Sequence, residues 1–283
     1  MAITFQQGTK LIIDDGTDRY LIAVSSATAS QSFTESSRAV KTIHNPVVVE
    51  DTFTTAKGSA NLSFSCYIGD GEAEDSILEL FGFVWSAGKY VLSTNNNTVN
   101  TADIYIDAGN TVYKLDTCVG ENISFKLSRK ELLSIDVSAK AVELIAGVPL
   151  PTNGVLHQQN LASLYNNTIN IPGFSDVVTV TCELTRDIRW LSQKSIHDIG
   201  SIYLPRNPVL GTLSMSGSIT RNKKDNNNSY SNSGVPITIE YGDTFKINLD
   251  QCNTTDRWDL GEVHKNVTDY KLMPTASNTY ITF

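Results

Sequence analysis

The stretch Asn61-Leu-Ser-Phe-Ser-Cys-Tyr-Ile68 decides the fold of the first half of the chain. Its even-numbered residues, from Leu62 to Ile68, are apolar and share one face of an extended backbone, while the serines and Tyr67 share the other. Alternation over eight residues is typical of a β-strand with one buried face. The segment therefore predicts a strand that lies over a hydrophobic core.

The same alternation recurs on both sides of this strand, between turn-forming clusters of Asp, Asn and Gly. In the first half it predicts strands at Lys10–Ile13, Tyr20–Ser25, Lys89–Ser93, Ala102–Ile106, Thr111–Leu115, Ile123–Leu127 and Leu133–Val137. In the second half it predicts Thr168–Ile171, Val177–Leu184, Gly211–Arg221, Pro236–Tyr241, Thr244–Leu249 and Tyr280–Phe283. The turn at 107–110 predicts a hairpin.

One helix is predicted, over Glu72–Trp85, because its first turn is acidic and Ile77, Leu78 and Phe81 fall near helical spacing. We expect this helix to cover a sheet. The acidic residues at its start lack the spacing of a calcium-binding loop, so they are interpreted as a solvated helix terminus.

The predicted fold class is mainly β, with two tandem β-sandwich or barrel-like units and at least one flanking α-helix. A length of 283 residues favours two domains. The strongest cluster of Gly and Pro in the middle of the chain, 146–154, marks the boundary. This gives a first domain at 1–148 and a second at 149–283.

Three short matches occur in the same order in both halves and indicate a tandem duplication. They pair Lys41–His44 with Lys194–His197, Leu62–Ile68 with Leu213–Ile219, and Leu115-Asp-Thr-Cys118 with Leu249-Asp-Gln-Cys252. The copies are unequal, because the polar low-complexity segment Asn222–Gly234 stands where the first copy has its helix. We expect that segment to be a mobile loop.

Composition excludes several classes of protein. The net charge is −8 and Lys and Arg do not cluster, which disfavours tight binding of nucleic acid or of anionic membranes. The N-terminus lacks the pattern of a signal peptide, and no apolar run approaches the ~18 residues that span a bilayer. We therefore expect a soluble protein made in a cytoplasm.

A search for chemistry finds no catalytic constellation, no cofactor motif and no metal site. The four cysteines are widely spaced, so they are interpreted as small buried hydrophobic residues, with disulfides as the alternative. His44 and His197 hold equivalent repeat positions, which favours an architectural role over catalysis. The chain is predicted not to be an enzyme.

Two long polar segments, one of them Ser30–Lys57, are candidate contacts between subunits, with solvated loops as the alternative. The candidate contact residues in them are Arg38, Lys41, His44, Arg189, Lys194 and His197.

The residues Leu115-Asp-Thr-Cys118, Ile123-Ser-Phe-Lys-Leu127 and Leu133-Ser-Ile-Asp-Val137 resemble the C-terminal strands of the major tail tube proteins of long-tailed bacteriophages. In that family an L-D-x-C segment precedes two paired strands. The segment Ser30–Lys57 is similar to the family's extended loop. The chain is thus identified as a tandem-duplicated relative of tail tube proteins.

The resemblance implies a structural virion protein of the phage tail, assembled in the host cytoplasm. Its subunits would form stacked rings through which DNA passes during ejection. Since single-domain members form hexamers, two units per chain imply a homotrimer with a pseudo-hexameric ring. The implied partners are further copies of the chain and other tail proteins (tape measure, terminator and distal tail), with no cofactor and no membrane. A further hypothesis is that the acidic residues face the bore of the tube, where their negative charge would oppose sticking of DNA.

Two alternatives remain open. The chain could be another tail or virion component, such as a tail terminator, a distal ring protein or a minor capsid protein. It could also be a carbohydrate-binding β-sandwich, although Trp85, Trp190 and Trp258 do not cluster in the sequence.

Overall fold

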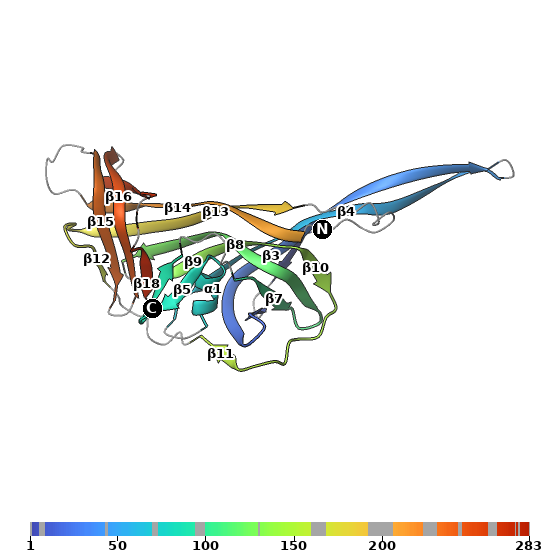
Figure 1. The fold of residues 1–283 in the computed structure, drawn as a ribbon, viewed down its shortest axis with the longest axis horizontal. Helices are drawn as coiled ribbons and strands as arrows, with labels where there is room; N and C mark the ends of the chain where they lie inside the picture. The colour runs from blue at the N-terminus through green and yellow to red at the C-terminus, as the bar shows by residue number, and fades with distance from the viewer. Residues whose placement is uncertain are drawn as a thin grey trace.

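The computed structural model is built almost entirely of strands (Figure 1), which confirms the mainly β prediction. It describes residues 2–5, 9–42, 45–69, 73–93, 100–129, 131–159, 168–191, 206–222, 231–242, 245–259, 265–274, 276 and 278–282.

In the first half the elements are β1 (Ala2–Phe5), β2 (Lys10–Asp14), β3 (Arg19–Thr42), β4 (Asn45–Tyr67), α1 (Asp75–Glu79), β5 (Phe83–Ser86), β6 (Lys89–Leu92), β7 (Ala102–Asp107), β8 (Val112–Ser128), β9 (Ser134–Ala141) and β10 (Glu143–Ala146). In the second half they are β11 (Leu156–Gln158), β12 (Ile169–Asn170), β13 (Val177–Leu191), β14 (Arg206–Asn222), β15 (Ser231–Tyr241), β16 (Phe245–Asp259), β17 (Lys265–Leu272) and β18 (Tyr280–Thr282).

The first half closes into a barrel. Its strands pair in the cycle β2–β3–β4–β9–β8–β7 and back to β2, and every pair is antiparallel. Leu11, Ile104, Leu115 and Phe64 are among the buried side chains of its core. Closure leaves these strands without a free edge along the paired segments.

The second half repeats this strand order. β13, β14, β17, β16, β15 and β12 pair in sequence, as β3, β4, β9, β8, β7 and β2 do. Matched segments of the duplication lie on corresponding strands, with Leu62–Tyr67 on β4 and Leu213–Ile219 on β14. The second cycle stays open in the described chain, because β12 pairs with β15 and not with β13.

The two halves are joined by strand pairing. Residues 122–128 of β8 pair antiparallel with 179–185 of β13. The C-terminal strand β18 bridges β16 of the second half and β6 of the first. Phe125 and Phe245 pack across the two halves with ring centroids 5.8 Å apart. The boundary at residues 148 and 149 stays a prediction, and the two halves share one sheet system.

The predicted helix over Glu72–Trp85 is wrong in its extent, since α1 covers only Asp75–Glu79. The chain turns at Gly82, whose φ of +81° suits glycine. Just before the turn, the Phe81 ring packs on Gly120, where an added Cβ would lie 2.7 Å from it. The apolar residues beyond the turn belong to strand β5, so they do not form a helical stripe.

The long polar segment Ser30–Lys57, predicted as a loop, is instead a two-stranded ribbon. β3 and β4 remain paired from Val24 opposite Cys66 out to Thr42 opposite Asn45. The ribbon projects from the body as a long arm (Figure 1). Its outer part contains many β-branched residues, which favour extended backbone.

Two further differences concern the second half. Ser231–Gly234, predicted as part of a mobile loop, belongs to β15, while residues 223–230 lie outside the described residues. The strand β17 was not predicted. Its sequence, Lys-Asn-Val-Thr-Asp-Tyr-Lys-Leu, alternates poorly, yet Val267 and Tyr270 are buried.

Candidate assembly surface

Eight long strands form one continuous antiparallel block in the order β3-β4-β9-β8-β13-β14-β17-β16. The first four and the last four correspond through the repeat. The β8–β13 pairing is therefore a junction between two equivalent units.

Polar contacts reinforce this junction on one face. Asn122 Nδ2 donates to Thr185 Oγ1 over 3.0 Å and to Glu183 Oε1 over 2.5 Å. Within the second unit and on the buried face, the Tyr270 hydroxyl of β17 donates to the carbonyl of Thr181 of β13 over 2.7 Å, and Gly217 of the intervening β14 leaves room for the ring. The junction is thus a specific ladder with side-chain contacts.

The two faces of the block differ sharply. One face is buried against the barrel interiors by Phe64, Val137, Ile123, Leu184 and Met215. The other face is lined by hydroxyl and amide side chains. One of its rows runs, from paired residue to paired residue, through Ser26, Ser65, Asp136, Ser124, Glu183, Ser216, Lys271 and Asn253.

Charges of both signs occur on this free polar face. Asp136, Glu183 and Lys271 stand in the row just traced, and Lys126 lies in the neighbouring row. Ser65 donates a hydrogen bond to Asp136 across the sheet. The described part of the face is therefore hydroxyl-rich and has no cluster of basic residues.

The block ends in two unlike edges. At one end, β16 pairs with β15 up to Thr255, and beyond it 256–259 pair only with β17 among the described residues. At the other end, β3 pairs with β2 through 19–23 and with β1 through 27–30. Between these segments, no described strand pairs with Val24–Ser26 on that side.

Three of the six candidate contact residues are described, and they lie on two ribbons. Arg38 lies in β3 opposite Asp51, and Lys41 lies near the end of the same strand. Arg189 lies in β13 opposite Val209, and its side chain is 79% exposed and pairs with Asp187 over 3.0 Å. His44, Lys194 and His197 lie outside the described residues. Their role as contacts stays a prediction.

Exposed apolar side chains lie at the bases of both ribbons. Phe33 of β3 is 44% exposed, and Val209 of β14 is 41% exposed. An exposed aromatic or aliphatic side chain is ordinary when single. A pair on corresponding ribbons is consistent with surfaces that another molecule covers.

The matched L-D-x-C segments share one feature of strand geometry. Cys118 lies opposite Ala102 while Leu115 lies opposite Ile104, so β8 has one residue more than β7 between these pairs. The second copy has the same extra residue, because Cys252 of β16 lies opposite Val235 of β15 while Leu249 lies opposite Ile237. The motif thus forms a β-bulge in both copies.

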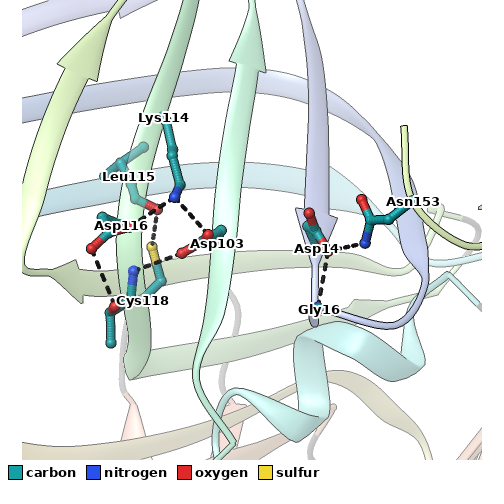
Figure 2. A network of polar contacts seen from close by, with 9 residues as sticks. Asp14, Gly16, Asp103, Lys114, Leu115, Asp116, Cys118 and Asn153 are labelled. Atoms are coloured by element: carbon teal, nitrogen blue, oxygen red, sulfur yellow. Dashed lines mark hydrogen bonds and ion pairs between the residues drawn. The ribbon is translucent and has the colours of Figure 1, made fainter. Parts of the chain in front are cut away.

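An ion-pair network holds the first bulge (Figure 2). Asp103 accepts from Lys114 over 2.7 Å and from the backbone N–H of Thr117 over 2.9 Å. Thr117 has a φ of +55°, which is uncommon for a residue with a branched side chain. The Cys118 thiol donates to the carbonyl of Leu115.

The breaker cluster at 146–154 is fastened to the first barrel. Asn153 donates to Asp14 over 3.0 Å (Figure 2), and Arg19 donates to the carbonyl of Pro151 over 2.9 Å. Gly154 has a φ of +56° and lies so close to Thr17 that a Cβ would meet its carbonyl at 1.8 Å.

The cysteines lie in the core. The four cysteines, Cys66, Cys118, Cys182 and Cys252, are free and buried, which confirms the interpretation of them as core residues. Among the described residues no cluster of His, Cys, Asp and Glu could hold a metal ion. No described helix is long and apolar enough to cross a membrane.

Glu74 corrects the interpretation of the acidic helix start as solvated. It is fully buried, accepts from the backbone N–H of Gly69 over 2.7 Å and from Gln159 over 3.1 Å, and burial raises its pKa to about 7.

Comparisons with known proteins give the class that the repeated β units point to, a structural protein of the phage tail or baseplate. A model of the Bacteriophage Baseplate Tube Protein Family matches residues 1–283, and the chain belongs to this family. It is 21% identical over 228 residues to baseplate tube protein p140 of Escherichia phage T5. The aligned segment covers 77% of this chain and 75% of that protein.

The sequence predicts strands in every member of the block except β17, but it does not predict the junction between the halves. Residues 179–185 alternate Thr, Val, Thr, Cys, Glu, Leu and Thr, which predicts a strand. Nothing in this pattern identifies β8 as the partner, because strand pairing is a long-range contact.

Proposed function

We propose that three copies of this chain close into a ring of the phage tail tube, at its baseplate end, and that stacked rings form a conduit for DNA. One observation carries this proposal. The chain contains two equivalent four-stranded units joined by the β8–β13 junction. The eight-stranded block that they form ends in β16, which corresponds to β8, and in β3, which corresponds to β13.

Ring closure would repeat the internal junction between chains. β16 corresponds to β8 and β3 corresponds to β13, so β16 of one chain can pair with β3 of the next. Three chains of eight strands each would give a barrel of twenty-four strands. At about 4.8 Å between strands and a tilt of about 40°, such a barrel is roughly 45–50 Å wide between backbones, enough for duplex DNA.

The free polar face of the block would line the bore. The opposite face is excluded from this role because it is buried in the barrels. The lining would be rich in hydroxyl groups, with charges of both signs. Low affinity for DNA would then follow from the lack of Lys and Arg clusters, more than from an acidic lining.

The ribbons β3–β4 and β13–β14 would reach neighbouring subunits or the next ring. Their length beyond the body and the exposed Phe33 and Val209 at their bases support this role. Other tail proteins would bind at the ends of the stack. A non-catalytic role is part of the same proposal.

Mass photometry of the purified protein, with negative-stain microscopy of the same sample, tests the proposal. Three chains of 31.0 kDa each predict a particle of about 93 kDa and ring-shaped images. Long tubes would indicate free stacking, and single rings would indicate a limited stack. A chain that remains a monomer up to high concentration, and is absent from rings in virions, would contradict it.

A further inference from the structure

The N-terminal strand β1 occupies the place at which a second copy of the chain would add. We propose that β1 guards the β3 edge in the free subunit and is displaced by β16 of the neighbouring chain when the ring closes. This inference rests on the proposed ring and concerns the regulation of its interface.

The repeat fixes which positions correspond. Thr28 of β3 lies opposite Ser63 of β4, and Thr185 of β13 lies opposite Ser214 of β14. Ser63 and Ser214 are equivalent residues of the matched strands, so Thr28 and Thr185 are equivalent as well.

On the side of the strand that faces away from β4 or β14, the two equivalent residues pair with different strands. Thr185 pairs there with Asn122 of β8, and Thr28 pairs there with Thr4 of β1. Both pairings are antiparallel. At Ala27 and Thr28 of the first unit, β1 therefore occupies the two ladder positions that β8 occupies at Leu184 and Thr185 of the second.

The two ladders differ in length. β8 and β13 pair through seven residues of each strand, 122–128 and 179–185. β1 contributes four residues, Ala2–Phe5, of which Ile3 is half-buried against the core. Because β2 holds residues 19–23 of β3, a neighbouring chain that pairs as β8 does can reach residues 24–28, and it extends over 27 and 28 only where β1 gives way.

β1 covers a strand edge that would otherwise be unpaired at 27–30. An unpaired strand edge promotes association with any other chain, and proteins commonly cover such edges with short strands. β3 is the last strand of the eight-stranded block, and on its outer side it pairs with β2 at 19–23 and with β1 at 27–30. Covering the edge with β1 would restrict pairing to a partner strand that matches residues 24–28 of β3.

A reversible disulfide tests this directly. Thr4 and Thr28 are opposite one another, at a separation of about 4.5–5.5 Å between Cα atoms for paired residues, which suits a disulfide. The variant T4C/T28C would lock β1 in place when oxidised. The native cysteines are buried, so the new pair would be oxidised selectively. S63C/S138C, which joins paired residues of β4 and β9 inside the block, is the matched control.

We expect oxidised T4C/T28C to lose rings in mass photometry and to regain them on reduction, while S63C/S138C forms rings in both states. A variant that lacks residues 2–5 should form rings at lower protein concentration than the natural chain. Equal ring formation by locked and reduced T4C/T28C would overturn the guard and leave the ring intact. If no variant and no natural chain forms rings, the proposed ring fails and the guard with it.

Discussion

Asn122 of β8 lies opposite Thr185 of β13, and its amide donates to the threonine hydroxyl over 3.0 Å. This contact joins two barrel-like units that correspond strand by strand. It shows how one unit adds to the next, and the proposed ring consists of the same contact repeated between chains.

The shared sheet predicts that the halves unfold together. β8 pairs with both β9 and β13, and β18 pairs with strands of both halves. Separation of the halves would expose the edge of β8 and the packed Phe125. We expect a single cooperative transition in differential scanning calorimetry of the monomer, whereas two resolved transitions would show that the halves are independent.

Gly154 should be intolerant of a side chain. Alanine there would adopt a positive φ and meet the carbonyl of Thr17, so G154A should lower the free energy of unfolding by about 1–3 kcal/mol in urea denaturation. Gly147 is the matched control, because its φ is +74° and an added Cβ meets nothing within 4 Å. An equal loss in G147A would assign the effect to the backbone conformation alone.

Asp103 should stabilise the bulge at Asp116 and Thr117. D103A leaves the N–H of Thr117 without its acceptor and removes a partner of Lys114, and we expect a loss of about 1–3 kcal/mol in urea denaturation. D107A removes an exposed carboxylate that accepts only from the nearby backbone of Gly109, and it should cost less. A loss in D107A as large as that in D103A would contradict the role of the network.

Glu74 should make stability depend on pH. Burial raises its pKa from 4.5 to about 7, so the folded state binds a proton that the unfolded state releases in this interval. The stabilisation is complete below pH 4.5 and is lost as pH rises to about 7, with a total of roughly 3 kcal/mol at about 1.4 kcal/mol per pKa unit.

The substitution E74Q keeps an acceptor for Gly69 and cannot ionise. The free energy of unfolding of E74Q, measured by urea denaturation from pH 4.5 to 8, should fall less with pH than that of the natural chain. E131Q, at an exposed glutamate, should leave the profile unchanged. Parallel profiles for E74Q and the natural chain would exclude Glu74 as the titrating group.

The sequence predicts best where burial imposes a period. Leu62–Tyr67 and Ile123–Leu127 alternate because each strand has one face in the core, and both lie in strands as predicted. The L-D-x-C matches lie at equivalent bulges because the same local geometry recurs in both copies.

The failures have physical causes as well. The sequence predicts a helix that is too long, because apolar residues of β5 follow Gly82 at a spacing close to helical. It predicts a loop in place of the β3–β4 ribbon, because the outer part of the ribbon has no regular alternation of apolar residues. The junction and the cover of β3 by β1 depend on contacts between distant segments, which no local pattern records.

Cryo-electron microscopy of assembled rings tests the central claim most directly. We expect three chains per ring and one continuous barrel, in which β16 of each chain pairs antiparallel with β3 of the next, as β8 pairs with β13. A ring of six chains, or a ring in which β3 and β16 of neighbouring chains lie apart, would contradict it.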